Sequence, residues 1–375
     1  MNDTKGALAG MRGPFFDPHR VEALPEVTPL GFVSGRDAMD LCEQGAAFAL
    51  AGGPLAFTHM RLGGEILGAA EIRRWAEQAG IADDAGPANC LEMMSAPRAA
   101  YADLPISGAG GRPRIMGVCN VTPDSFSDGG KHAAPHAAIG FARDLVRAGA
   151  DIIDIGGEST RPGAVPVSTT EEMDRVLPVV EALAGDGVKL SIDTRNADVM
   201  QAALEAGASI INDITALTGP GAIDVAAASG ASVILMHMQG SPATMQDDPR
   251  YDAVVSDIFD WLATRVDACV QAGISLDRIA VDPGFGFGKT LAHNVALLAD
   301  LARFHGLGCA LAVGLSRKSF LGTLGGEEDP AARVVGSVTA ALDAIGRGAQ
   351  ILRVHDVVET RQALAVWRGA AGLAT

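Results

Sequence analysis

The stretch that decides the fold runs from Ile115 to Gly130 and reads IMGVCNVTPDSFSDGG. Its first part is a short apolar run typical of a buried strand, and its second part is a loop of hydroxyl, acidic and glycine residues. The change from apolar to polar occurs at Asn120. The same change recurs along the chain, each time with polar residues at the carboxyl end of a short apolar run. Parallel α/β barrels display their active sites in this way.

Eight apolar runs are predicted to be strands, with helical patterns between them. The predicted strands are residues 115–119, 152–155, 189–192, 209–211, 232–236, 279–281, 310–313 and 351–353. The predicted helices are residues 133–147, 171–184, 197–206, 252–272, 291–304 and 331–345. Pairs such as Gly149-Ala150 and Gly207-Ala208 mark helix ends that turn into strands. Eight strand–helix units over about 260 residues favour a (β/α)8 TIM barrel over a doubly wound sheet.

The chain is predicted to carry a small α/β extension before the barrel. The barrel should span residues 114–370, after a linker rich in Gly and Pro over residues 104–113. Residues 1–103 form the extension, whose role the sequence does not reveal; helices are expected over 36–51 and 70–79 and a strand over 55–62. Because the extension holds no cluster of catalytic side chains, we expect a chain that starts near Gly110 to remain active.

Composition excludes several classes of partner. The formal net charge of −16 disfavours nucleic acid, which requires a basic surface. No apolar run approaches the roughly 18 residues of a membrane-spanning helix, and the N-terminus lacks the apolar core of a secretory signal. The five cysteines are scattered without CxxC spacing, which favours free thiols in a reducing cytoplasm. We therefore expect a cytoplasmic protein that acts on small molecules and binds neither nucleic acid nor membranes. A homodimer is also expected, although composition does not bear on it.

If the strands close into a barrel, the residues that follow them face one common mouth. These residues include carboxylates, amides, histidines and cations: Asn120, Asp154 to Arg161, Asp193, Asn212, His237, Asp282, Gly314 to Lys318, Arg353 and His355. Asp193, Asn212 and Asp282 could pair with a cyclic amidine such as the edge of a pterin. A metal site is a second interpretation, although no group of histidines accompanies the carboxylates. His237 fits a wall residue as well as a participant.

Three loops are suited to anions or to a flat ring. The loop GGESTRPG, residues 156–163, offers hydroxyls and Arg161, which can grip phosphate oxygens with two parallel hydrogen bonds. The turn from Ser316 to Ser319 combines Arg317 and Lys318 with the start of a helix, which favours an anion site. The loop GFGFGKT, residues 284–290, matches neither a Walker loop nor a dinucleotide fingerprint. Its glycines would let a flat ligand approach Asp282, with Phe287 available for stacking.

These motifs resemble those of the dihydropteroate synthase family. The resemblance rests on segments that stand in that family's order: Asn120 to Gly130, Gly156 to Gly163, Met236 to Gly240, Asp282 to Lys289, Ser316 to Lys318 and Arg353 to Asp356. It covers residues 112–370 and leaves out residues 1–111. The resemblance implies a TIM-barrel transferase of folate biosynthesis. Such an enzyme condenses 6-hydroxymethyl-7,8-dihydropterin pyrophosphate with para-aminobenzoate, and sulfonamides compete with the second substrate.

The resemblance also implies roles for individual residues. The pterin would be held by Asp193, Asn212, Asp282 and Lys318, and Asp193, Asp282 and Lys318 are the predicted catalytic residues. The pyrophosphate would be held by Thr160, Arg161, Arg353 and His355, and Asn120 would bind the Mg2+ that the pyrophosphate carries. The aminobenzoate ring would lie beside Phe126 and Pro162. The remaining predicted substrate-binding residues are Met236, Phe287, Ser319 and Val354.

Two other functions stay open at this point. A pterin-binding methyltransferase barrel shares the acidic pterin edge, but it handles a methyl-folate and a corrinoid partner. Because it has no pyrophosphate to hold, the Ser159 to Gly163 loop and the Ser316 to Lys318 turn disfavour it. A non-catalytic pterin-binding paralogue should have lost mouth residues, and the sequence shows no such loss. Pyrophosphate release with and without aminobenzoate would separate the three functions.

Overall fold

Eight parallel strands close into a barrel, as the sequence predicts. The computed structural model describes residues 26–79, 87–98, 100–107, 112–122, 133–159 and 167–373. The strand order around the barrel is β10-β11-β12-β13-β14-β7-β8-β9. The strands are β7 (Arg114–Asn120), β8 (Ile152–Gly156), β9 (Lys189–Asp193), β10 (Ile210–Asp213), β11 (Ser232–Met236), β12 (Ile279–Asp282), β13 (Ala310–Val313) and β14 (Ile351–Val354). All eight predicted strands are confirmed, with boundaries that differ by at most one residue or two.

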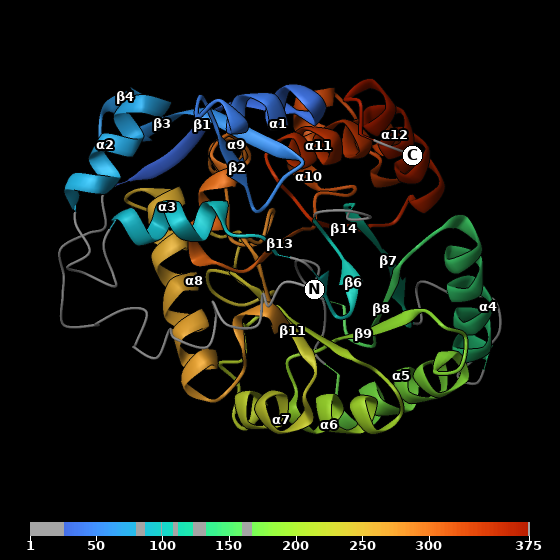
Figure 1. The fold of residues 1–375 in the computed structure, drawn as a ribbon. Helices are drawn as coiled ribbons and strands as arrows, with labels where there is room; N and C mark the ends of the chain where they lie inside the picture. The colour runs from blue at the N-terminus through green and yellow to red at the C-terminus, as the bar shows by residue number, and fades with distance from the viewer. Residues whose placement is uncertain are drawn as a thin grey trace, which may run out of the picture.

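Helices surround the strands and form the outer layer of the barrel (Figure 1). They are α4 (Ala133–Ala148), α5 (Thr169–Leu183), α6 (Ala197–Glu205), α7 (Ala222–Ser229), α8 (Val254–Gln271), α9 (Leu291–Ala299), α10 (Ser319–Gly325), α11 (Val334–Gly346) and α12 (Val357–Ala370). The helix predicted over 291–304 is too long, because α9 ends at Ala299 and the 3-10 helix η3 (Leu301–Leu307) follows. Asp300, between them, is held by Arg61 of the extension, with Nη2 at 2.6 Å from Oδ1. A contact so distant in the chain leaves no local pattern.

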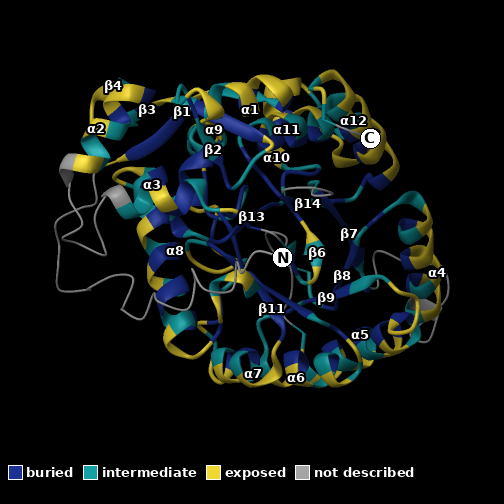
Figure 2. Cartoon of the chain, viewed as in Figure 1, coloured by how far each residue is buried: buried dark blue, intermediate teal, exposed yellow. Residues whose placement is uncertain are grey.

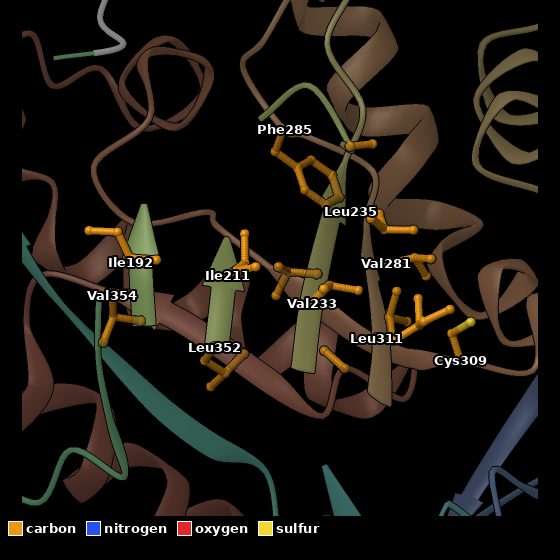
Figure 3. Close-up of a cluster of buried hydrophobic side chains, with 14 of the residues drawn as sticks. Ile192, Ile211, Val233, Leu235, Val281, Phe285, Cys309, Leu311, Leu352 and Val354 are labelled. Carbon is orange, nitrogen blue, oxygen red and sulfur yellow. The ribbon is translucent and has the colours of Figure 1, made fainter. Parts of the chain in front are cut away.

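Successive residues of a barrel strand face the helices and the barrel interior in turn. Outward-facing side chains such as Ile211, Val233 and Leu311 pack with the helices into the largest apolar cluster (Figure 3). Inward-facing side chains form a second buried cluster, with members Met116, Ile152, Ile210, Ile234, Ala280, Ala310, Ala312 and Ile351. Most of these inward-facing residues stand at the amino ends of their strands. The barrel strands are buried, whereas the helices expose their outer faces (Figure 2).

A short hairpin closes the amino end of the barrel. Its strands are β5 (Ala100–Tyr101) and β6 (Leu104–Pro105). Tyr101 and Ile106 are buried in the inward-facing cluster, and Arg114 Nε at the start of β7 donates to the Pro105 carbonyl at 2.8 Å. The linker predicted over 104–113 therefore begins in a strand that packs on the barrel. Two-residue strands have no hydrophobic period of their own, so only contact with the barrel floor stabilises them.

The extension is an antiparallel sheet with three helices. Strand β3 (Leu55–Leu62) pairs with β1 (Val27–Ser34) on one side and with β2 (Phe48–Leu50) and β4 (Glu65–Gly68) on the other. The helices are α1 (Gly35–Glu43), α2 (Ala69–Ala79) and α3 (Pro87–Ser95). The predicted strand over 55–62 is confirmed, and the helix over 70–79 begins one residue earlier. The helix predicted over 36–51 is wrong in its second half, because Gly45 takes the left-handed φ of +70° that ends α1.

The extension packs against the side of the barrel, near η3 and α12 (Figure 1). Phe57 and Met94 share an apolar cluster with Ala302 of η3 and Trp367 of α12. Arg98 is buried at this contact; its Nε donates to the Cys309 carbonyl at 3.1 Å. None of the helices within the described ranges has the length and apolar character that crossing a membrane requires.

Candidate active site

Polar side chains gather where the barrel strands end. Asn120, Asp193 and Asp282 are the last residues of β7, β9 and β12. Asn212 is the third residue of β10, and Arg353 is the third residue of β14. Parallel barrel strands bring their carboxyl ends to one mouth. The structure therefore brings these five predicted site residues to the same end of the barrel.

Arg353 bridges two buried carboxylates in this mouth. Its Nε donates to Asp154 Oδ2 at 2.6 Å, and its Nη2 donates to Asp193 Oδ2 at 2.6 Å. Asp154 also accepts hydrogen bonds from Asn212 Nδ2 at 3.1 Å and from Ser191 Oγ at 2.7 Å. The network joins residues of β8, β9, β10 and β14, so the closed barrel itself holds the site together.

The charges of this network are coupled. Burial raises the pKa of the Asp193 carboxyl; Arg353 opposes that rise and the Asp154 carboxylate adds to it. Burial disfavours the charged form of Arg353, but Asp154 and Asp193 outweigh it and raise the pKa of the guanidinium overall. Arg353 is therefore a permanent cation. With both carboxylates ionised, the three side chains carry one net negative charge.

Asp282, Lys318 and Phe287 form a second group at the mouth. Asp282 Oδ1 accepts a hydrogen bond from Gly284 N at 2.7 Å. Burial raises the pKa of Asp282, while the Gly284 hydrogen bond and the charge of Lys318 lower it. Lys318 Nζ lies 3.9 Å from the centre of the Phe287 ring, a cation–π contact. A cation, a carboxylate and a half-buried aromatic ring thus adjoin one another.

The loop after β12 is built against the loop after β11. Gly284 has φ +71°, and a Cβ there would lie 1.9 Å from the His237 carbonyl oxygen, so only glycine fits. Lys289 Nζ donates to the Phe287 carbonyl at 2.9 Å and lies 3.1 Å from His237 Nδ1. Burial lowers the pKa of Lys289 to about 7 and that of His237 to about 3. The neutral His237 thus accepts from Lys289 and belongs to the wall.

His355 has a neutral imidazole, whereas the Arg317 guanidinium is paired with a carboxylate. His355 Nδ1 is 3.0 Å from Ser316 Oγ, and burial, together with the charge of Arg353, lowers the pKa of the imidazole to about 3. Arg317 donates to both oxygens of Asp356, at 3.1 Å from Nε and 2.5 Å from Nη2. Asp356 therefore engages the Arg317 guanidinium, and the anion site predicted for residues 316–319 stays a prediction.

The other predicted residues occupy varied positions. A Cβ at Gly156 would lie 3.5 Å from both Asn120 Oδ1 and Asp193 Cβ, so Asn120 and Asp193 lie on either side of Gly156. Met236 is buried and pairs in register with Asp282. Val354 packs in the outward-facing cluster, so its backbone rather than its side chain can face the mouth (Figure 3). Ser319 is exposed at the start of α10. Four predicted residues lie outside the described ranges: Phe126, Thr160, Arg161 and Pro162.

The side chains at the mouth offer few ligands for a metal ion. Within the described ranges, no three His, Cys, Asp or Glu residues are grouped to hold a metal ion. Mg2+ prefers oxygen ligands and is commonly bound through one or two protein groups together with substrate phosphates. Asn120 offers a single amide oxygen at the mouth. This fits a Mg2+ ion that arrives with a phosphorylated substrate and does not fit a resident metal site.

The pattern of strand ends in the sequence places Asp154 at the mouth without a role and does not include Ser191, whereas the structure places both in the network. One signal was available: Asp154 stands two residues after the inward-facing Ile152, so the two residues share the barrel interior. A buried carboxylate also requires partners. Which partners it finds depends on the register of β8, β9 and β10, and local sequence does not contain that register.

Residues 116–355 match the model of a family described as pterin binding enzyme. The dihydropteroate synthase of Escherichia coli strain K12 is 50% identical over 255 residues, which cover 68% of this chain and 90% of that protein. The chain belongs to the dihydropteroate synthase family.

Solved structures of dihydropteroate synthases share the barrel. The Yersinia pestis dihydropteroate synthase in a sulfonamide drug complex is 52% identical, with a TM-score of 0.66, over 69% of this chain and 94% of that chain. The Xanthomonas albilineans dihydropteroate synthase in complex with 7,8-dihydropteroate is 48% identical, with a TM-score of 0.64, over 69% of this chain and 94% of that chain. The family match begins at residue 116, so the extension lies outside it.

Proposed function

We propose that the barrel mouth condenses 6-hydroxymethyl-7,8-dihydropterin pyrophosphate with para-aminobenzoate, giving 7,8-dihydropteroate and pyrophosphate in folate biosynthesis. The observation that carries this proposal is the buried network of Asp193, Asn212 and Arg353 in a chain of this family. The reaction breaks the bond between the pterin methylene and the pyrophosphate oxygen and forms a carbon–nitrogen bond. The neutral aromatic amine is itself a nucleophile, so no activated side-chain nucleophile is required.

Asp193, Asn212 and Asp282 hold the pterin edge. A pterin presents adjacent N–H donors and an acceptor, which two carboxylates and an amide complement. Both carboxylates are largely buried, and charges act more strongly on one another where water is excluded. Positive charge develops on the pterin methylene as the carbon–oxygen bond breaks. The negative charge of Asp193 and Asp282 stabilises that transition state.

Lys318, Phe287 and Met236 complete the pterin pocket. Lys318 Nζ lies over the Phe287 ring and near Asp282, which leaves it positioned to donate to a polar atom of the pterin. Phe287 is half-buried and offers a flat surface for the ring. The buried Met236 supplies an adaptable apolar contact.

The pyrophosphate is held by the loop after β8 and by residues at the carboxyl end of β14. The Arg353 guanidinium and the neutral imidazole of His355 contribute hydrogen bonds, with the Val354 backbone between them. Thr160 and Arg161 add a hydroxyl and a guanidinium from the loop after β8. Asn120 would hold the Mg2+ that accompanies the pyrophosphate, and the ion would lower the negative charge of the leaving group there.

The second substrate binds outside the pterin. We propose that Phe126 and Pro162 flank the aminobenzoate ring and that Ser319, exposed at the start of α10, lines the same entrance. Sulfonamides mimic aminobenzoate, and one is bound to the Yersinia pestis relative. They are therefore expected to compete with aminobenzoate, and not with the pterin substrate, in this enzyme.

Pyrophosphate release tests the proposal directly. The purified protein is given the pterin pyrophosphate with and without aminobenzoate, and pyrophosphate and dihydropteroate are both measured. A dihydropteroate synthase makes the two products in equal amounts when the amine is present. A pterin-binding methyltransferase or a non-catalytic paralogue releases neither, and that result would overturn the proposal. The relatives give no support to these two alternatives.

Asp193→Asn tests the pterin edge. Loss of one charge-assisted interaction should weaken pterin binding at least about tenfold. Calorimetry with the pterin substrate measures the affinity, and a cooperative melt shows whether the variant is folded. Wild-type turnover together with wild-type affinity would remove Asp193 from the site.

We also propose that the enzyme is a cytoplasmic homodimer. The five cysteines are all unpaired, which supports a reducing compartment. Light scattering of the full-length chain should give the mass of two chains. A mass of one chain at micromolar concentration would contradict the dimer.

A further inference from the structure

Asp154 is the most enclosed group of the polar network. Its side chain has no exposed surface, and it stands on β8 between Ile153 and Ile155, which both pack outward against the helices. Asp154 therefore faces the barrel interior, one layer above the inward-facing Ile152. A ligand in the mouth would meet Asp193, Asn212 and Arg353 before it could meet Asp154.

The two oxygens of Asp154 hold three side chains. Oδ2 accepts from Arg353 Nε at 2.6 Å and from Asn212 Nδ2 at 3.1 Å, and Oδ1 accepts from Ser191 Oγ at 2.7 Å. Arg353 and Asn212 come from strands on either side of β8 in the barrel. Each has rotatable bonds that would otherwise let it choose among several rotamers. Hydrogen bonds to a fully buried carboxylate select one rotamer for each.

The orientation of Asn212 follows from the same contact. An amide side chain presents its oxygen on one side and its nitrogen on the other. Because Asn212 Nδ2 donates to Asp154, its Oδ1 points away from that carboxylate and can accept from a donor in the mouth. Arg353 is fixed similarly, since Nε and Nη2 are both engaged with carboxylates.

We infer that Asp154 is a positioning residue, which sets the rotamers of Asn212 and Arg353 from beneath and so aims both at the pterin substrate. The inference rests on the proposed function. Asp154 touches no substrate and acts through its two partners. It is also the second carboxylate, beside Asp193, that contacts the Arg353 guanidinium.

Two variants at this position separate geometry from charge. Asp154→Asn keeps one acceptor oxygen for Arg353 and Asn212 and can turn its amide nitrogen toward Ser191 Oγ. Asp154→Ala removes every acceptor and frees both partners. We expect kcat/KM for the pterin substrate to fall about tenfold in Asp154→Asn and about a hundredfold or more in Asp154→Ala. The KM for aminobenzoate should stay close to the wild-type value in Asp154→Asn.

The pH profile supplies a measurement that a purely structural role would not change. Asp193 is faced by Arg353 of β14, Asp154 of β8, Asp213 of β10 and Glu172 of α5. Activity should fall as the pH falls and Asp193 takes up a proton. Asp154→Asn removes the negative charge beside Asp193, and Asp193 is then the remaining carboxylate that contacts Arg353. The pKa of Asp193 should therefore drop. The acid limb of kcat/KM should therefore move to lower pH in this variant.

Asp151→Asn is the matched control. Asp151 immediately precedes β8 at the other end of the barrel, is 10% exposed, and accepts hydrogen bonds from Arg112, Arg114 and the Ile115 N–H. Its variant loses a comparable buried carboxylate without touching the mouth. It should melt at a lower temperature yet keep the wild-type KM for the pterin and the wild-type acid limb.

The outcomes separate this inference from the proposed function. If the wild-type protein forms no dihydropteroate, the proposed function fails. If the wild type is active and Asp154→Asn keeps its pterin KM, its kcat and its acid limb, the positioning role is overturned. Should both Asp154 variants fail to fold, Ser191→Ala removes only the Oδ1 contact. A rise in the pterin KM of Ser191→Ala then supports the positioning role, and an unchanged pterin KM contradicts it.

Discussion

At the scale of single residues, burial decides which groups carry charge. Burial lowers the pKa of His237, His305 and His355 to about 3 and that of Lys289 to about 7. Arg353, which is half-buried, remains charged because two carboxylates contact it. The mouth therefore combines the neutral imidazoles of His237 and His355 with the fixed positive charge of Arg353.

Lys318→Ala tests the residue that lies over Phe287. Lys318 is half-buried and immediately precedes α10, so its loss should leave the melting temperature nearly unchanged. Loss of a charge-assisted hydrogen bond in the site should lower kcat/KM about ten- to a hundredfold. Steady-state kinetics with both substrates, read beside a thermal melt, measures the two effects. Normal turnover by a folded variant would remove Lys318 from the site.

His305 links stability to pH. The folded protein holds His305 neutral down to about pH 3, whereas the unfolded chain takes up a proton near pH 6.5. The unfolded state therefore binds more protons between these values, and the free energy of unfolding falls as the pH falls through them. His305 alone should cost about 2 kcal/mol between pH 7 and pH 5.

Urea unfolding of His305→Gln at both pH values checks this loss. Glutamine can still donate to the Gly348 carbonyl, which His305 Nε2 contacts at 3.0 Å, but it cannot titrate. The variant should become more stable relative to the wild type as the pH falls. A constant difference between wild type and His305→Gln would contradict the neutral buried imidazole.

At the scale of elements, close backbone approach shapes the loop after β12. Gly284→Ala would put a Cβ against the His237 carbonyl, whereas Gly230, with a nearly equal φ of +76°, has no atom within 4 Å of the corresponding position. Both substitutions lower the free energy of unfolding by about 1 kcal/mol, because alanine is strained at a left-handed φ. Gly284→Ala should cost at least about 2 kcal/mol more, since backbone must move. Equal unfolding free energies for the two variants would show that the loops are not in contact.

At the scale of the whole molecule, the hairpin and the extension have different parts in the barrel. Tyr101 and Ile106 fill the barrel floor, whereas the sheet of the extension covers η3 and Trp367 on the outside. A chain that starts at residue 100 should keep its turnover, although its newly exposed apolar side should promote association. A chain that starts at Gly110 also lacks the floor and should lose at least about 4 kcal/mol of stability.

Urea unfolding, turnover and gel filtration of the two shortened chains test this difference. The structure thus changes the earlier expectation that a start near Gly110 is harmless. If both chains unfold at the same urea concentration and are equally active, the hairpin is not part of the barrel fold.

The sequence by itself determined the barrel, its eight strands and most of the residues at its mouth. Short apolar runs followed by polar residues are local patterns. In a parallel barrel the active site lies at the carboxyl ends of the strands, so the residues that end each strand can be assigned to the site. Asp193, Asn212, Asp282 and Arg353 could be named on that ground alone. The family motifs added Lys318 and Asn120.

Only the tertiary structure decided which of these side chains bind one another. Asp154 meets Arg353 across 199 residues of chain and Asn212 across 58, and Arg317 turns out to be paired with Asp356. The packing of the hairpin against the barrel floor and the hydrogen bond from Arg98 Nη2 to the His305 carbonyl in η3 are likewise contacts between distant segments. Such contacts depend on strand register and on how separate elements dock. A local hydrophobic pattern records which face of an element is buried, but it does not record what that face is buried against.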